Sequence, residues 1–294
     1  MNGAHMEPSF ESLMDQARGD HAGEPAAVAA RLAAMAALVQ APAQLQALAH
    51  LAHHVWGEHL HDWAGGQHAL QALAGHAHAD ATTHEAMQRY RTSLSLSAGD
   101  QTPVAPLSPS DQVRAHAMAA ANVTGCDTGR AQALLLRALA LAKAHALPDN
   151  DPCMRALAVG GHNLACELEE KLERSPAERE LMLLAAQVSR THWALAGGWL
   201  EVERAEYRLS NSWRLAGDAA RAREHAQACL ALVQQHGSPA LEAFFGWEVL
   251  ALAEQALGNG PAQAAAWAQA RAAFEQLGAD DQVWCRATLD KLLA

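Results

Sequence analysis

Glycine recurs at an almost constant interval in the C-terminal third of the chain. Gly197, Gly217, Gly237, Gly258 and Gly278 lie 20, 20, 21 and 20 residues apart. The stretches between them contain no interior proline, and each is long enough for about four to five helical turns. Glycine readily adopts the left-handed conformation that ends many helices. The interval therefore predicts helices of similar length joined by minimal loops, which is the arrangement of antiparallel helical hairpins.

The composition favours the same fold class. Ala fills 70 of the 294 positions, whereas Ile is absent, Val occurs 12 times and Thr 8 times. Strands are built mainly from β-branched and aromatic residues, so this chain has little material for them. Aromatic residues make up only 5% of the chain, and we expect helices that pack closely through Ala and Leu. The sequence predicts an all-α protein.

Turn and cap signals divide the chain into four parts. Three prolines within residues 98–111 predict a linker or loop. The predicted parts are a flexible N-terminal tail over 1–22, N-terminal helical hairpins over 23–97, the linker over 98–111, and hairpin repeats over 112–294. The last segment, with Trp284, is predicted to pack as a capping helix. The pattern leaves open whether the two helical blocks form one continuous superhelix.

Two segments carry a recognisable repeat. In residues 54–73 and 207–230 a helix ends at a short turn, and small residues follow at the positions where a second helix would cross the first. In the second segment the turn is Ala216-Gly217-Asp218, and the small residues are Ala222, Ala226 and Cys229. This pattern resembles the tetratricopeptide repeat, although the units run nearer 40 than 34 residues. The resemblance implies a right-handed superhelix, or α-solenoid, of stacked antiparallel hairpins whose first helices line a concave face.

One polar face within the repeats is a candidate peptide-binding surface. On the helix expected over 199–216, polar side chains lie opposite the apolar stripe, given about 100° per residue. These candidates are Arg204, Tyr207, Arg208, Asn211 and Arg214. Like charges one turn apart, as at Arg204 and Arg208, favour an anionic ligand such as an acidic side chain or a peptide carboxylate.

The family resemblance adds one residue to this surface. Some tetratricopeptide proteins hold a partner's C-terminal carboxylate between Lys, Arg and Asn side chains on consecutive first helices, and Asn163 occupies the comparable place on the preceding unit. The competing interpretation is that the arginines pair with Glu201, Glu169 or Glu170 on a solvated face.

The 17 histidines suggest an alternative function. His50, His54, Glu58 and His61 fall within about 80° on one helical face. Histidines four residues apart can share a metal ion, and Glu58 with His61 has the E-x-x-H spacing of di-iron helical bundles. Such bundles need a second E-x-x-H and further glutamates from other helices, and the sequence contains no second E-x-x-H. We therefore predict no metal and no cofactor, with a histidine-based metal-binding protein as the alternative.

Other function classes find little support. The sequence contains no nucleophile elbow, metalloprotease, dinucleotide-binding or P-loop motif. The glycine pair Gly160-Gly161 indicates close helix packing rather than a phosphate cradle, because no strand precedes it. A net charge of −11 disfavours a nucleic-acid partner, and the apolar runs are too short to span a membrane.

The predicted function is a non-enzymatic scaffold that binds a peptide segment of another protein in its concave groove. A ligand-sensing domain of a regulatory system is a further alternative. The first ten residues show no secretory signal. Five scattered cysteines give no disulfide or zinc pattern. These features predict a cytoplasmic protein. The identity of the partner and the oligomeric state stay open.

Overall fold

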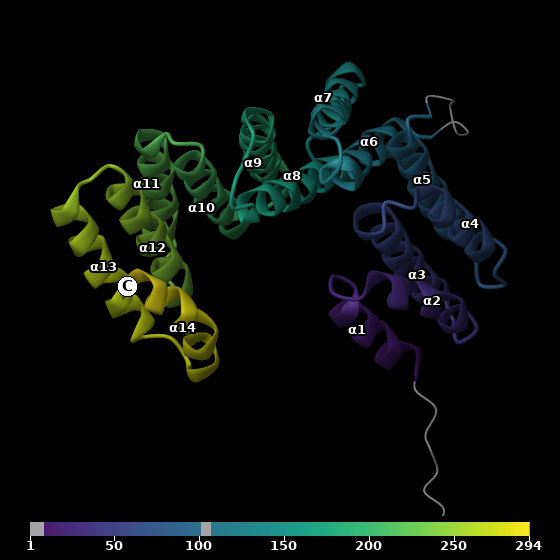
Figure 1. The fold of residues 1–294 in the computed structure, drawn as a ribbon, viewed down its shortest axis with the longest axis horizontal. Helices are drawn as coiled ribbons and strands as arrows, with labels where there is room; N and C mark the ends of the chain where they lie inside the picture. Colours follow the sequence, from purple (N-terminus) through teal and green to yellow (C-terminus); the bar gives the residue numbers. More distant parts are fainter. Residues whose placement is uncertain (1–8, 101–106, 294) are drawn as a thin grey trace, which may run out of the picture. The chain divides into compact units, whose positions relative to one another are not determined.

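The computed structural model describes residues 9–100 and 107–293, and within them the chain is all-α (Figure 1). The chain divides into two compact units, residues 1–148 and 149–294. The helices of unit 1 are α1 Phe10–Asp20, α2 Pro25–Ala36, α3 Pro42–His54, the π-helical turn η1 Val55–His59, α4 Trp63–Ala74, α5 Ala81–Ala98, α6 Pro109–Val123 and α7 Thr128–Ala144. Those of unit 2 are α8 Pro152–Glu170, α9 Pro176–Ala196, α10 Trp199–Leu215, α11 Ala219–Gln235, α12 Ala240–Ala256, α13 Gly260–Phe274 and α14 Ala279–Leu293.

The boundary between the units differs from the one predicted at residues 98–111. Helices α5 and α6, which flank that stretch, pack against each other within unit 1. The proline-rich segment therefore connects two packed helices and does not separate two blocks. Helix α6 also begins at Pro109, capped by Ser108. Residues 101–106 lie outside the described part of the chain.

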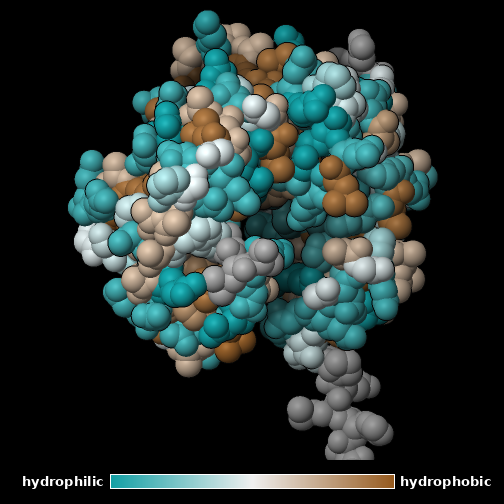
Figure 2. Space-filling view, turned by 60° about the vertical axis from the view of Figure 1, so that its left-hand side comes forward, coloured by the Kyte–Doolittle hydropathy of each residue, from teal (hydrophilic) through white to brown (hydrophobic). Residues whose placement is uncertain are grey.

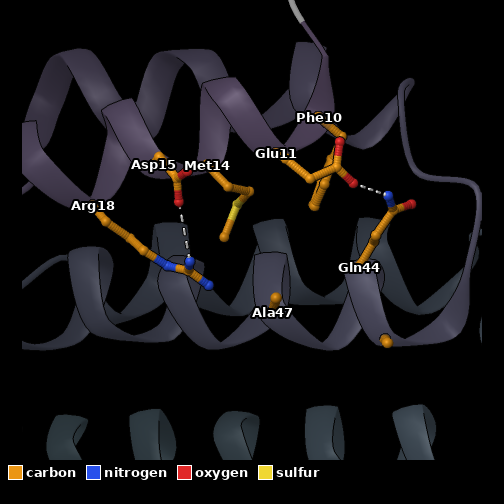
Figure 3. Close-up of a pocket in the computed structure, with 8 residues that line it drawn as sticks. Phe10, Glu11, Met14, Asp15, Arg18, Gln44 and Ala47 are labelled. Carbon is orange, nitrogen blue, oxygen red and sulfur yellow. Dashed lines mark hydrogen bonds and ion pairs between the residues drawn. The ribbon is translucent and has the colours of Figure 1, made fainter.

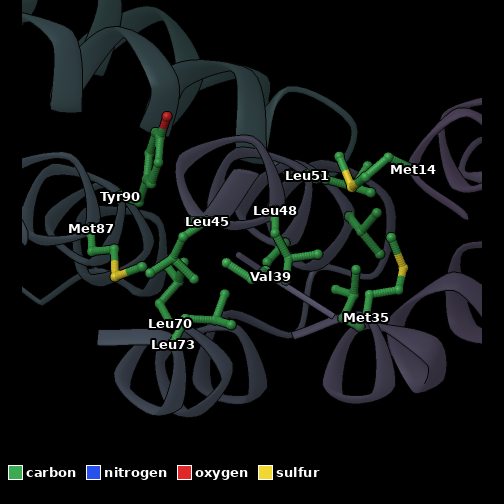
Figure 4. Packing of buried hydrophobic residues seen from close by; sticks show 14 of the residues in the cluster. Met14, Met35, Val39, Leu45, Leu48, Leu51, Leu70, Leu73, Met87 and Tyr90 are labelled. Atoms are coloured by element: carbon green, nitrogen blue, oxygen red, sulfur yellow. The ribbon is translucent and has the colours of Figure 1, made fainter. Parts of the chain in front are cut away.

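The core of unit 1 joins its first five helices and η1 (Figure 4). Its fully buried centre is made of Val28, Leu45, Leu48, Val55, Leu70 and Leu94. Methionine fills the gaps between helices, since Met14, Met35 and Met87 are all buried there.

The tail predicted over residues 1–22 is wrong for residues 10–20, which form α1. The Ser9 side chain caps this helix by accepting from the Ser12 amide. Phe10, Met14 and Ala17 then point to one side and are buried in the core of unit 1. Their spacing of four and three residues is the amphipathic signal. Residues 1–8 lie outside the described residues.

In unit 2, consecutive helices pack as antiparallel pairs. The most extensive contacts join α8 with α9, α10 with α11, and α12 with α13, and α14 follows on α13. Gly217, Gly237 and Gly258 adopt positive φ angles of 93°, 85° and 72°, as predicted for helix ends. Gly197 does not, because its backbone is extended. The recurring interval thus predicts the helices correctly, although not every glycine takes the same conformation.

The pair α8 and α9 makes its closest approach at Gly161. A Cβ atom at this position would lie 2.6 Å from the backbone oxygen of Ala185 and 2.9 Å from the backbone nitrogen of Ser189. The neighbouring Gly160 is half-exposed, and a Cβ atom there would point into open space. Only the second glycine of the pair is therefore required by helix packing.

The last helix closes a small core around Phe244, which is fully buried. From α14, Cys285 and Leu289 are buried against this core. Trp284 is predicted to pack there, but its side chain faces outward and the residue is 65% exposed. It contacts the edge of the cluster through Phe245, at 5.5 Å between ring centroids.

The surface of the described residues is mainly polar. In Figure 2, apolar residues are scattered among hydrophilic ones on the face shown. None of the helices in residues 9–100 and 107–293 combines the length and the apolar character that crossing a bilayer requires.

Candidate functional site

Five of the six candidate peptide-binding residues lie on α10, and the sixth, Asn163, lies on α8. Helix α10 contacts α9 and α11, and it also contacts α8 and α12. Helices α8, α10 and α12, which are the first helices of the three pairs, therefore lie next to one another (Figure 1). We call the surface that these three helices share the first-helix face. Because α8 and α12 cover part of α10, its polar side chains are not all free to meet a ligand.

Arg208 forms an ion pair with Glu169 of α8. Glu169 also accepts a hydrogen bond of 2.6 Å from the Ser212 hydroxyl. The side chains of Arg208 and Glu169 are only 19% and 8% exposed. Burial raises the pKa of Glu169, and the Arg208 charge and the Ser212 hydrogen bond partly offset that rise. The competing interpretation of the sequence anticipated a pairing with Glu169 on a solvated face; the pairing is present, but it is largely buried and joins two neighbouring first helices.

Tyr207, Asn211 and Arg214 form a second group, directed towards α12. The Tyr207 ring packs edge-on against Phe245, and its hydroxyl interacts with the side chains of Glu248 and Asn211. Burial and the Glu248 charge raise the pKa of Tyr207. Arg214 donates to Asn211 Oδ1 at 3.1 Å. Of the three, Tyr207 joins α10 to α12 through Phe245 and Glu248, whereas Arg214 and Asn211 bond to each other within α10.

Arg204 is the member of the predicted set on α10 that reaches solvent most clearly. Its side chain is 58% exposed, and its Nη2 lies 3.3 Å from Glu242 Oε1 on α12. The Glu242 side chain is 12% exposed. His162 of α8 lies within electrostatic range, because burial and then the charges of Arg208 and Arg204 lower its pKa to about 4. Within the Arg204–Glu242 pair, the arginine is the partner that faces solvent.

Asn163 is placed differently from its predicted partners. It is exposed on α8, whereas the α8 residues that interact with Arg208 are His162, Cys166 and Glu169. In a helix, Asn163 is rotated by about 100° from His162. The structure therefore does not bring Asn163 into the group around Arg208. His162 was not among the predicted residues, and its spacing of seven residues from Glu169, which places both on one side of α8, is the signal that could have identified it.

Acidic side chains are buried on the other side of α10. Glu203 is 2% exposed and accepts a hydrogen bond of 2.9 Å from the Cys229 thiol. Burial raises the pKa of Glu203 to about 7, and burial does the same for Glu248 on α12. Glu206 is buried between Arg190 and His225. Burial alone would raise the pKa of Glu206, but these two partners outweigh it and lower the pKa.

The four residues of the predicted metal alternative do not converge. His54 Nδ1 lies 3.0 Å from Glu58 Oε1, but His50 lies against the Tyr90 ring. His61 donates to the backbone oxygen of Asn122 instead. Among the described residues, the group that could hold a metal ion is a different one, made of His21, His54 and His59.

A hollow of about 340 Å³ lies between α1 and α3 in unit 1 (Figure 3). Its walls are Phe10, Glu11, Met14, Asp15, Arg18, Ala43, Gln44 and Ala47. The polar groups on its walls bond to one another, because Gln44 donates to Glu11 at 2.6 Å and Arg18 lies 3.5 Å from Asp15. The hollow therefore offers no set of polar groups directed at a ligand.

Comparison with known proteins assigns no family. No family model matches the chain, and no curated protein matches it either. The likeness to tetratricopeptide repeats consequently depends on the residues and the helix pairing, and the function must be argued from the geometry.

Proposed function

We propose that the protein is a non-enzymatic scaffold whose unit 2 is a right-handed, tetratricopeptide-like α-solenoid segment. Its ligand is an acidic peptide segment of another protein, which binds along the first-helix face. The observation that carries this proposal is the direct contact of α8, α10 and α12 in sequence order. Such contacts are those expected where first helices lie on one side of a stack and second helices lie behind them, as in solenoids that bind peptides.

The distribution of charge supports an acidic ligand. The chain has a net charge of −11, yet the two acids paired with Arg208 and Arg204, Glu169 and Glu242, are only 8% and 12% exposed. Arg204 remains exposed, and its contact with Glu242 is long. An exposed arginine of this kind can exchange a weak internal contact for a forked hydrogen bond to a carboxylate.

The other predicted residues have supporting roles in this proposal. Arg208 and Tyr207 fix the relative positions of the first helices through Glu169 and Glu248. They hold Arg204 in place and do not themselves provide the main contact. Asn163 flanks the same helices from the exposed side of α8.

Selection from a peptide library tests the proposal. Random peptides are selected on the immobilised full-length protein, and the enriched peptides are synthesised with free and with amidated C-termini. We expect enriched peptides to share acidic side chains or to need the free carboxylate. The Arg204→Glu variant should bind them at least about tenfold more weakly, which corresponds to about 1.4 kcal/mol.

A matched control reverses a charge on a second helix. Arg179 is exposed on α9, so Arg179→Glu changes the net charge equally without touching the first-helix face. We expect Arg179→Glu to bind the peptides as the wild type does. Equal binding by the wild type and Arg204→Glu, or a selection that enriches no common feature, would reject the acidic-peptide proposal.

The cysteines support a reducing compartment, which we propose to be the cytoplasm. All five are free thiols, and Cys153, Cys229 and Cys285 are buried. Free thiols are usual where the surroundings are reducing.

A further inference from the structure

Three histidines from two distant segments meet in unit 1. His21 follows the last residue of α1, His54 ends α3, and His59 ends η1. One ring nitrogen from each lies within 4.8 Å of the other two. We propose that His21, His54 and His59 bind a divalent transition-metal ion of the zinc type.

The hydrogen bonds of His21 and His54 fix which ring nitrogen carries the lone pair. His21 Nδ1 lies 2.6 Å from the backbone oxygen of Arg18, and a carbonyl can only accept. His54 Nδ1 lies 3.0 Å from Glu58 Oε1, and a carboxylate likewise accepts. In both neutral rings the proton is therefore on Nδ1 and the lone pair is on Nε2. His54 Nε2 accepts a hydrogen bond from His59 Nε2 at 3.1 Å, so a metal ion bound between these two nitrogens takes the place of that shared proton.

The distances fit tetrahedral coordination. Two imidazoles on one zinc ion, with Zn–N bonds of about 2.0–2.1 Å, have their nitrogens about 3.3 Å apart. His54 Nε2 and His59 Nε2 are 3.1 Å apart. The nitrogen of His21 needs to move inward by at most about 1.5 Å from the 4.8 Å limit. His21 lies between helices and is half-exposed, so a rotation of its side chain supplies this movement.

The π-helical turn η1 creates the closest pair. In an α-helix, residues five apart are rotated by about 140° and cannot meet. In η1, the Leu60 amide bonds to the Val55 carbonyl five residues earlier, and the widened turn brings the His59 ring edge-on against His54. Their ring centroids are 4.7 Å apart. Single π-helical turns are rare and occur often at functional sites.

Glu58 supports the site as the hydrogen-bond partner of one of its ligands. It accepts the Nδ1 proton of His54, which is the arrangement that orients metal-bound histidines and increases their basicity. Glu58 also adds a negative charge close to the proposed cation. With three protein ligands, a fourth coordination position stays open for water or another ligand. The bound ion would tie the α1–α2 connection to η1.

Metal titration of the full-length protein, without a polyhistidine tag and after chelator treatment, tests the site. We expect one equivalent of Co²⁺ to bind and to give the intense visible absorption of four-coordinate cobalt, and Zn²⁺ to displace it. His21→Ala and His59→Ala should abolish that absorption and weaken Zn²⁺ binding at least tenfold. Glu58→Gln should keep the four-coordinate spectrum but weaken binding by roughly 10- to 100-fold.

The control is a histidine pair that lacks a third ligand. The rings of His76 and His78 lie 5.6 Å apart, so His78→Ala should bind Co²⁺ and Zn²⁺ as the wild type does. Circular dichroism of the metal-free variants checks their folding. If His59→Ala is misfolded, the metal titration of His21→Ala alone tests the proposal, because His21 lies outside the helices. Absence of a saturable equivalent in the wild type, or intense absorption that persists in His21→Ala, would overturn the proposal.

Discussion

The glycine pair in α8 allows the packing of unit 2 to be tested with two single substitutions. Gly160 and Gly161 are adjacent, yet only Gly161 faces α9. Replacing either by Ala adds one methyl group and gains the same helix propensity, about 1 kcal/mol. The two variants therefore differ only in what the new methyl group meets.

The size of the effect follows from the distances at Gly161. The new Cβ atom would lie 2.6 Å from the Ala185 carbonyl oxygen, whereas ordinary contacts begin near 3.4 Å. Since the obstacle is backbone, α8 and α9 must separate by about 0.8 Å over their contact. Overpacking of this kind costs about 1–3 kcal/mol, and we expect the upper end. Gly161→Ala should then lose about 2 kcal/mol in total, and Gly160→Ala should gain about 1 kcal/mol.

Thermal and urea unfolding, followed by far-UV circular dichroism, measure this difference. With about 2–4 °C for each kcal/mol in a unit of this size, Gly160→Ala should raise the midpoint by about 2–4 °C and Gly161→Ala should lower it by about 4–8 °C. If Gly161→Ala were as stable as Gly160→Ala, α8 and α9 would not approach each other as closely as described. The reasoning about small-residue contacts would then be refuted.

Two further predictions concern the buried charges of unit 2. Arg208→Ala leaves the carboxylate of Glu169 buried without its partner, so we expect unfolding to become easier by about 3–5 kcal/mol, whereas the exposed Arg204→Ala should cost less than about 1 kcal/mol in the same urea titration. For Glu248, burial raises the pKa from 4.5 to about 7. In the folded state this carboxyl group therefore keeps its proton up to a higher pH than in the unfolded state. Its contribution to stability is complete below pH 4.5 and is lost as the pH rises to about 7. The midpoint of Glu248→Gln relative to that of the wild type should therefore rise between these pH values and level off above about pH 7, and a constant difference would contradict the assignment.

The helices of unit 2 were predictable because their ends are marked locally. Gly217 and Asp218 both act within one turn of the chain, the first through its positive φ and the second by accepting from the Arg221 amide. Such signals need no knowledge of the neighbouring helices. The same holds for Ser175, which caps the start of α9 in a capping box with Glu178.

The site was less predictable, because burial on α10 depends on which helices flank it. Amphipathic spacing places Arg208 and Asn211 on a free face, but α8 and α12 cover that face. It gives no indication that Glu203 is buried. The π-helical turn was also missed, because it spans only Val55–His59 and the spacing was interpreted as that of a regular α-helix. Without it, His59 cannot be matched with His54.

The pairing of consecutive helices has a consequence for how the chain reaches this structure. Each connection within unit 2 is only a few residues long, so bringing partners together removes little chain entropy. Proteins dominated by such local contacts fold quickly. During synthesis, α8 and α9 can pair as soon as both have left the ribosome, before α12 has been translated. Unit 2 should therefore fold one hairpin at a time as it leaves the ribosome, before its C-terminal residues have been translated.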